Sequence, residues 1–129
     1  MRARSIVGGV ASLFVLVSAL AHGAGGWPVQ RAALAEAGAD AELIRAMAAG
    51  WLFGSAAMAV FGILGLRAAW VTWRGKAESP WPMRILGGGY ALFGIATIIA
   101  QRGNWFFLVF VVPGLAMAAS AASGSASDG

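Results

Sequence analysis

Four stretches of apolar residues, separated by short polar segments, dominate the chain. Their approximate bounds are 5–24, 46–67, 83–101 and 104–120. An α-helix rises about 1.5 Å per residue, and roughly 20 apolar residues cross a hydrocarbon core of about 30 Å. The pattern predicts an all-α integral membrane protein, a four-transmembrane-helix bundle. Residues 1–120 are expected to form a single transmembrane domain.

Proline and small polar residues mark the connections between these stretches. Pro80 and Pro82 end helices and stiffen the chain, so residues 68–82 are predicted to form a loop. Pro113 lies inside the fourth stretch and is expected to kink it. The Ser/Ala/Gly-rich residues 121–129 lack bulky apolar side chains and are predicted to be a disordered tail.

Residues 25–45 are the only substantial polar segment and are predicted to form a short helical outer loop. Pro28 can open a first helical piece, and Gly38 can close it. Asp40 can cap a second piece that runs into the next span.

The first apolar stretch fits two interpretations. Arg2, Arg4, the apolar run and the small residues around Ala21 match a signal peptide cleaved after Ala21. Extended to Gly26, the same stretch is also long enough for a retained helix. Retention is favoured because the polar segment 31–45 would otherwise hang from a free terminus.

The distribution of positive charge predicts the orientation. One side of the predicted topology collects six cationic residues: Arg2, Arg4, Arg67, Arg74, Lys76 and Arg84. The other side collects only Arg31, Arg45 and Arg102. Since short cytoplasmic loops carry the excess of Lys and Arg, both chain ends are predicted to be cytoplasmic, in a bacterial inner membrane.

The tryptophans give the same division of the two sides. Trp27, Trp51 and Trp105 lie at the predicted outer ends of spans, and Trp70, Trp73 and Trp81 lie at the inner ends. Tryptophan is enriched at both membrane–water interfaces, so these positions fit two aromatic belts.

Composition narrows the class and the partners. Hydrophobic residues make up 60% of the chain and charged residues 11%, whereas a soluble domain has roughly 25% charged residues. The net charge of +4 lies beside apolar runs, which favours anionic membrane lipids over nucleic acid as partners. The absence of cysteine from the sequence excludes disulfides and thiolate metal sites.

Small residues at helical spacing are expected to bring the helices together. Lipid gives no hydrophobic drive for helix association, so close backbone contact must supply the attraction. The small-residue positions are Gly8 and Ser12; Gly50, Gly54, Ser55, Ala59 and Gly62; Gly87, Gly88, Gly89 and Gly94; and Gly114 and Ala118. Packing within one bundle is the expected use, with a homo-oligomer or a membrane protein partner as the alternative.

Candidate chemistry is sparse, and no catalytic, cofactor-binding or metal-binding residue is predicted. His22 is the only histidine and is expected to be an interfacial residue. Glu36, Asp40 and Glu42 cluster in the polar outer segment, where nothing desolvates them for acid–base work. The predicted spans carry no ionisable group in their middle, which removes the usual mark of a proton or ion path.

One resemblance rests on the segments around the first two spans. Ala21-His22-Gly23, the arginine-bearing outer segment and the tryptophan that opens the second span resemble small uncharacterised four-span proteins of bacterial inner membranes. Those proteins often have a histidine after the tryptophan, where this chain has Leu52. The resemblance implies the four-span topology and lends no activity.

Together these patterns predict a non-enzymatic, multi-pass membrane protein of structural or accessory type that binds lipid or a membrane partner. The alternative is a small oligomeric transporter or permeation element without embedded charges. Its polar groups would be Ser55, Tyr90, Thr97 and Gln101.

Overall fold

The computed structural model describes residues 2–76 and 79–121, and every regular element in these ranges is helical. In chain order they are α1 (Arg2–Leu20), the π-helix η1 (Ala21–Gly26), α2 (Trp27–Glu36), α3 (Ala41–Trp73), α4 (Trp81–Ala100), the 3-10 helix η2 (Trp105–Phe107) and α5 (Leu108–Ser120). The predicted all-α class is confirmed. Of the predicted tail, residues 122–129 lie outside the described residues.

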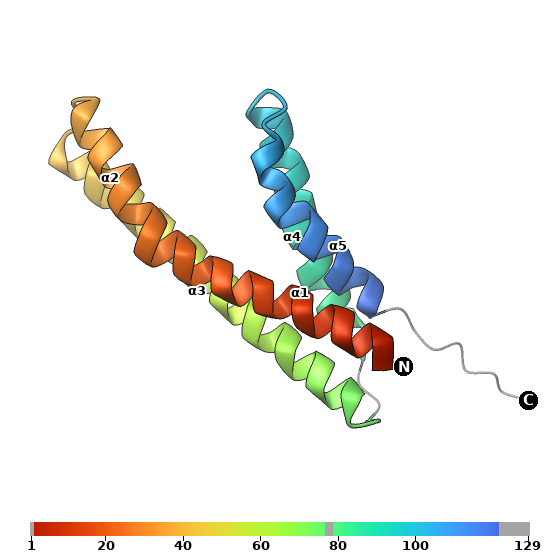
Figure 1. Cartoon of the computed structure of the whole chain (residues 1–129). Coiled ribbons are helices and arrows are strands. Elements are labelled where there is room, and N and C mark those ends of the chain that lie inside the picture. Colours follow the sequence, from red (N-terminus) through yellow and green to blue (C-terminus); the bar gives the residue numbers. More distant parts are fainter. Residues whose placement is uncertain (1, 77–78, 122–129) are drawn as a thin grey trace, which may run out of the picture.

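The helices form two antiparallel hairpins that meet at one end and diverge at the other (Figure 1). In the long hairpin, α1, η1 and α2 run as one helix beside α3; in the short hairpin, α4 runs beside α5. Contacts between α1 and α5 join the hairpins, whereas α3 and α4 barely touch.

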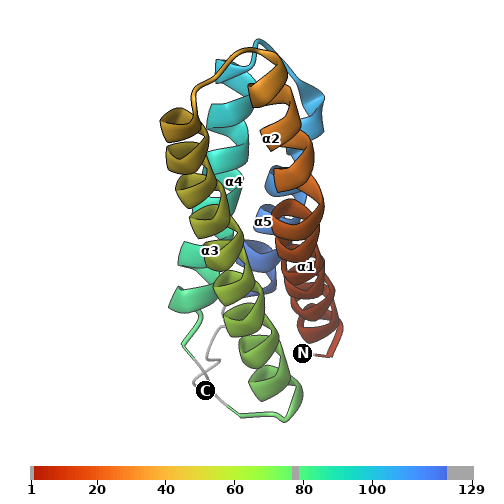
Figure 2. The same cartoon turned by 90° about the vertical axis from the view of Figure 1, so that its left-hand side faces the viewer.

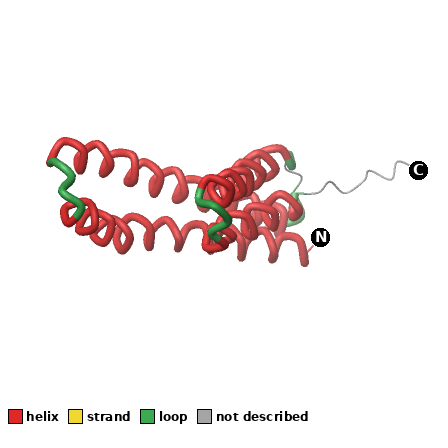
Figure 3. The backbone as a smooth tube through the Cα atoms, turned by 90° about the horizontal axis from the view of Figure 1, so that it is seen from above, coloured by secondary structure: helices red, strands yellow, loops and turns green. Residues whose placement is uncertain are grey.

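Figure 2 shows that α1 and α4 begin, and α3 and α5 end, at the same end of the molecule. We call this the basic end, because its described cations are Arg2, Arg4, Arg67, Arg74, Lys76 and Arg84. The opposite, turn end holds the α2–α3 and α4–η2 connections, and Figure 3 shows that these two connections lie far apart.

Three helices are long and apolar enough to cross a membrane: Arg2–Glu36 with 35 residues, Ala41–Trp73 with 33 and Trp81–Ala100 with 20. At 1.5 Å per residue they reach about 50, 50 and 30 Å. The predicted fourth span is an apolar helix over Trp105–Ser120, which is shorter and reaches about 24 Å. The hairpins are therefore unequal in length.

The turns follow the signals in the sequence. The Asp40 carboxylate accepts a hydrogen bond from the Leu43 backbone N–H at 2.7 Å and so caps α3, as expected. Gly38, with φ of +79°, ends α2, which confirms its predicted role. Pro80 is the N-cap of α4 and Pro82 lies in its first turn, where a missing N–H costs nothing.

The predicted outer loop 25–45 differs from the structure in its first half. Pro28 does not open a separate helical piece, because the helix continues from α1 through η1 into α2. A proline inside a helix removes one N–H and clashes with the carbonyl four residues earlier. The wider turn of the π-helix immediately before Trp27 relieves this conflict, so the chain need not break.

The short hairpin is held by glycine-to-backbone contact, as the small-residue pattern predicted. A Cβ on Gly87 would lie 2.5 Å from the Gly114 carbonyl oxygen, and one on Gly114 would lie 2.6 Å from the Ala91 nitrogen. About two turns after Gly87 along α4, a Cβ on Gly94 would lie 3.0 Å from the Val111 nitrogen. The two backbones touch, which maximises the dispersion contact between them.

In the long hairpin the close contacts fall at a different part of α3 from the one predicted. A Cβ on Gly62 would lie 2.8 Å from the Leu16 nitrogen, and one on Gly65 would lie 2.9 Å from the Ser12 Cβ. Gly50 has no neighbour within 4 Å, and Gly54 has only the His22 imidazole at 3.8 Å. The ridge predicted from Gly50 to Gly62 therefore packs only through its last member.

Met117 lies where the two hairpins meet. It is 1% exposed, and its terminal methyl would be 3.0 Å from a Cβ on Gly65 of α3, while its own Cβ would be 3.0 Å from one on Gly87 of α4. Ser12 and Val15 of α1 are fully buried beside it. This junction is the core of the molecule, and most large apolar side chains elsewhere are exposed.

Candidate functional site

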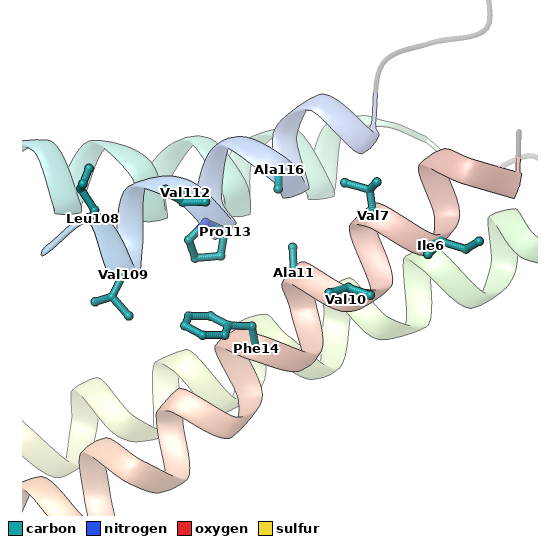
Figure 4. A pocket seen from close by; sticks show the side chains of 10 residues that line it. All are labelled: Ile6, Val7, Val10, Ala11, Phe14, Leu108, Val109, Val112, Pro113 and Ala116. Atoms are coloured by element: carbon teal, nitrogen blue, oxygen red, sulfur yellow. The ribbon is translucent and has the colours of Figure 1, made fainter. Parts of the chain in front are cut away.

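An apolar groove runs between α1 and α5 and has a volume of about 420 Å³ (Figure 4). This lies within the range of about 300–1,000 Å³ that is usual for small-molecule sites. Its lining consists of Ile6, Val7, Val10, Ala11 and Phe14 from α1 and Leu108, Val109, Val112, Pro113 and Ala116 from α5. All ten side chains are apolar.

The spacing of these residues explains how the groove forms. The α1 residues recur every three or four positions and so share one face of that helix, and the α5 residues do the same. Ala11 and Ala116 face each other across the groove in Figure 4, and their single methyl groups leave its middle open. Larger residues close it on either side.

The groove is open along its length rather than sealed inside the bundle. Val10 of α1 is 64% exposed and Val112 of α5 is 62% exposed, although both line it. An apolar groove open to water would be costly, at about 25 cal/mol for each Å² of apolar surface. The arrangement therefore suits an apolar occupant or an apolar surrounding medium.

A second constellation lies where η1 packs against α3. The imidazole of His22 stacks on the indole of Trp51, with ring centroids 4.1 Å apart and planes within 7°. The Trp51 indole N–H donates a hydrogen bond of 2.8 Å to the His22 carbonyl oxygen. Trp27 packs against the same indole at 6.2 Å.

Small residues make this aromatic cluster possible. A Cβ on Gly26 would lie 2.9 Å from the Trp51 ring, and one on Gly23 would lie 3.0 Å from the Ser55 hydroxyl. The π-helix thus presents Gly23 and Gly26 to α3. Because His22 and Trp51 pair with each other, the cluster is a packing feature of the long hairpin.

Of the polar groups considered for transport, Ser55 belongs to α3, and the other three belong to α4 or its C-terminal cap. The hydroxyls of Ser55 and Thr97 donate to carbonyl oxygens of their own helices, Trp51 at 3.3 Å and Phe93 at 2.8 Å. Tyr90 packs edge-on against Phe110 with its hydroxyl buried and without a partner among the described residues. Gln101 is exposed at the end of α4.

The three clustered carboxylates lie around the α2–α3 turn, and Asp40 is used as the cap of α3. Within residues 2–76 and 79–121, no three His, Cys, Asp or Glu side chains are close enough to hold a metal ion.

Sequence reasoning missed both the groove and the stacking of His22 on Trp51. A signal for the groove exists in hindsight: Ala11 and Ala116 are the small members of two otherwise bulky apolar faces. The stacking has no local signal, because His22 and Trp51 are 29 residues apart. The chain matches no protein-family model, no curated protein and no solved structure.

Proposed function

We propose that this is a non-enzymatic accessory protein of the membrane that holds the acyl chain of a membrane lipid in the groove between α1 and α5. The observation that carries the proposal is the groove itself, with ten apolar lining residues and an open side. A hydrocarbon chain is the occupant that needs no polar partner.

The proposed setting is a bacterial inner membrane crossed by α1, α3, α4 and the η2–α5 segment. The three long apolar helices support it, as do the exposed large apolar residues on their surfaces. The η2–α5 segment is short for a bilayer, and local thinning with interfacial side chains accommodates such a mismatch. The resemblance to small four-span inner-membrane proteins points to the same setting.

The proposed orientation places the basic end in the cytoplasm, in agreement with the positive-inside rule. Aromatic side chains support an interface at this end, since the Arg2 guanidinium lies 5.8 Å from the Trp73 ring centre and that of Arg74 lies 5.7 Å from Trp70. The long hairpin is about 20 Å longer than a hydrocarbon core. Its excess length at the turn end carries the polar residues between Gln30 and Arg45, which would stand in water outside the cell.

Retention of α1 belongs to the same proposal. This helix supplies Ala11, Ser12, Val15 and Ala19 to the core and one wall of the groove. Cleavage after Ala21 would remove both.

Topology is tested by reporter fusions. A green fluorescent protein fused after Gly129 is expected to fluoresce, and alkaline phosphatase inserted beside Glu36 is expected to be active, because the two sites lie on opposite sides of the membrane. The opposite pair of results would reverse the orientation. Activity of only one of the two reporters would place both sites on the same side of the membrane and contradict the four-span topology.

Occupancy of the groove is tested with a lipid that carries a photoreactive diazirine on its acyl chain. In vesicles, cross-links are expected to concentrate on the groove faces of α1 and α5. Ala116→Phe places a ring in the middle of the groove and is expected to reduce this labelling several-fold. Leu115→Phe places the same ring at a position of the same helix that is 55% exposed and does not line the groove, and it is expected to leave labelling unchanged. Equal labelling of both variants and the unaltered protein would refute the proposal.

The alternative of a permeation element gains no support from the polar residues named for it. Ser55 and Thr97 satisfy their hydroxyls within their own helices. None of Ser55, Tyr90, Thr97 and Gln101 lines the groove.

A further inference from the structure

We propose that the lipid held in the groove is an anionic phospholipid, whose phosphate lies at the N-terminal end of α1 beside Arg2 and Arg4. This inference rests on the proposed function and adds the class of head group and its place. It follows from the position of the groove, the rows of residues on α1 and the distribution of charge.

The groove has the length and position of one leaflet's acyl chain. Along α1 it extends from Ile6 to Phe14, and eight residues of helix rise about 12 Å. Half of a hydrocarbon core is about 15 Å. The groove begins near the basic end and stops near the middle of the bundle, so it can take a chain from the leaflet at the basic end.

On α1, the two rows of side chains that line the groove each begin with an arginine, Arg2 or Arg4. Residues three or four apart are neighbours on the surface of a helix. Arg4 precedes Val7 and Ala11 in one such row, and Arg2 precedes Ile6 and Val10 in the other. The guanidinium of Arg2 lies over the ring of Trp73, on the α3 side. Arg4 is therefore the closer continuation of the groove wall.

The surroundings of this position favour an anion. The first N–H groups of α1 have no partner within the helix, and the helix dipole makes this end positive. The described acidic residues, Glu36, Asp40 and Glu42, all lie at the turn end. The sequence holds two further acidic residues, Glu78 and Asp128, which lie outside the described residues. A head group with a net negative charge complements the basic end better than a zwitterionic one.

The experiment uses the full chain in nanodiscs that contain equal amounts of phosphatidylcholine and phosphatidylglycerol with identical acyl chains. Native mass spectrometry then counts which lipid stays on the protein. Phosphatidylglycerol is expected to be enriched among the retained lipids. Each arginine near a membrane surface contributes roughly a fivefold preference for anionic lipid, so Arg2→Gln with Arg4→Gln should lower the enrichment at least fivefold.

Matched variants separate this site from general surface charge. Arg31→Gln with Arg45→Gln removes the same charge at the turn end and is expected to keep the enrichment. Arg4→Lys keeps the positive charge at the groove and should therefore also keep the enrichment of phosphatidylglycerol. This variant remains informative if Arg2→Gln with Arg4→Gln fails to fold.

The outcomes distinguish the two levels of the proposal. The anionic site would be refuted if lipid is retained without enrichment of phosphatidylglycerol. It would also be refuted if both double variants lose this enrichment equally. Either result would leave the proposed binding of an acyl chain in the groove intact. Retention that Ala116→Phe does not reduce would overturn the groove function itself.

Discussion

Replacing Gly114 by leucine is expected to separate α4 from α5 and to leave little folded protein. A Cβ at this position would lie 2.6 Å from the Ala91 nitrogen, 2.7 Å from the Gly87 carbonyl oxygen and 3.0 Å from the Ala91 Cα. All three atoms belong to backbone and cannot turn aside as a side chain would. Inserting a larger side chain into a packed core typically costs about 1–3 kcal/mol of stability. The cost for Gly114→Leu should reach or exceed the upper end of this range, because backbone atoms cannot move aside.

The measurement is the yield of monodisperse protein in detergent and its thermal unfolding. Gly88→Leu is the control on the facing helix, since no atom lies within 4 Å of a Cβ built there. That variant is expected to resemble the unaltered protein. Comparable yield and unfolding temperature for Gly114→Leu and Gly88→Leu would show that the two backbones are not in contact.

The second large effect is expected for Gly62→Leu, which should force α1 away from α3. A Cβ on Gly62 would meet the nitrogen, Cα and Cβ of Leu16 at 2.7–2.9 Å. Separation of these helices by even one ångström weakens dispersion contacts along much of the long hairpin. A loss of about 3 kcal/mol or more in the free energy of unfolding is the expected result.

Gly50→Leu is the matched control, because Gly50 lies on the same helix and has no neighbour within 4 Å. It should leave stability in detergent almost unchanged. If Gly50→Leu proved the more harmful, the part of α3 near the turn end would have to be the true contact.

These two pairs of variants show what the sequence could and could not predict. Length and hydropathy were sufficient for the four apolar helices, and local rules were sufficient for the Asp40 cap and the turn at Gly38. Both depend on residues that are neighbours in the chain. The general rule that small residues mediate packing also held, since Gly87, Gly94 and Gly114 all lie at close helix contacts.

The sequence could not predict which of the glycines lie at contacts between helices. In a soluble helix the buried face is apolar and the exposed face polar, so the pattern identifies the contact side. Here both faces are apolar: exposed Phe53 and Val60 share α3 with buried Met58 and Gly62. Gly50 and Gly62 therefore look alike in the sequence, and only the crossing of α1 over α3 distinguishes them.

The groove was hidden for a related reason. It is formed by residues more than 90 positions apart, Ile6 to Phe14 on one side and Leu108 to Ala116 on the other. Each face alone reads as an ordinary apolar helix surface. The small residues Ala11 and Ala116 indicate a groove only once α1 and α5 are known to face each other, and no local pattern encodes that arrangement of the two hairpins.

The π-helix has a consequence for the phase of the long helix. Ser12 and Ala19 are buried and one heptad apart, and Trp27 and Leu34 are half-buried and again one heptad apart. From Ala19 to Trp27, however, the count is eight residues. In an α-helix one extra residue would rotate the contact stripe by about 100°, but the wider π turn takes up that residue without rotating the helix that follows. The chain thus behaves as two heptad segments joined by a one-residue skip, which keeps both halves turned toward α3 across the position of Pro28.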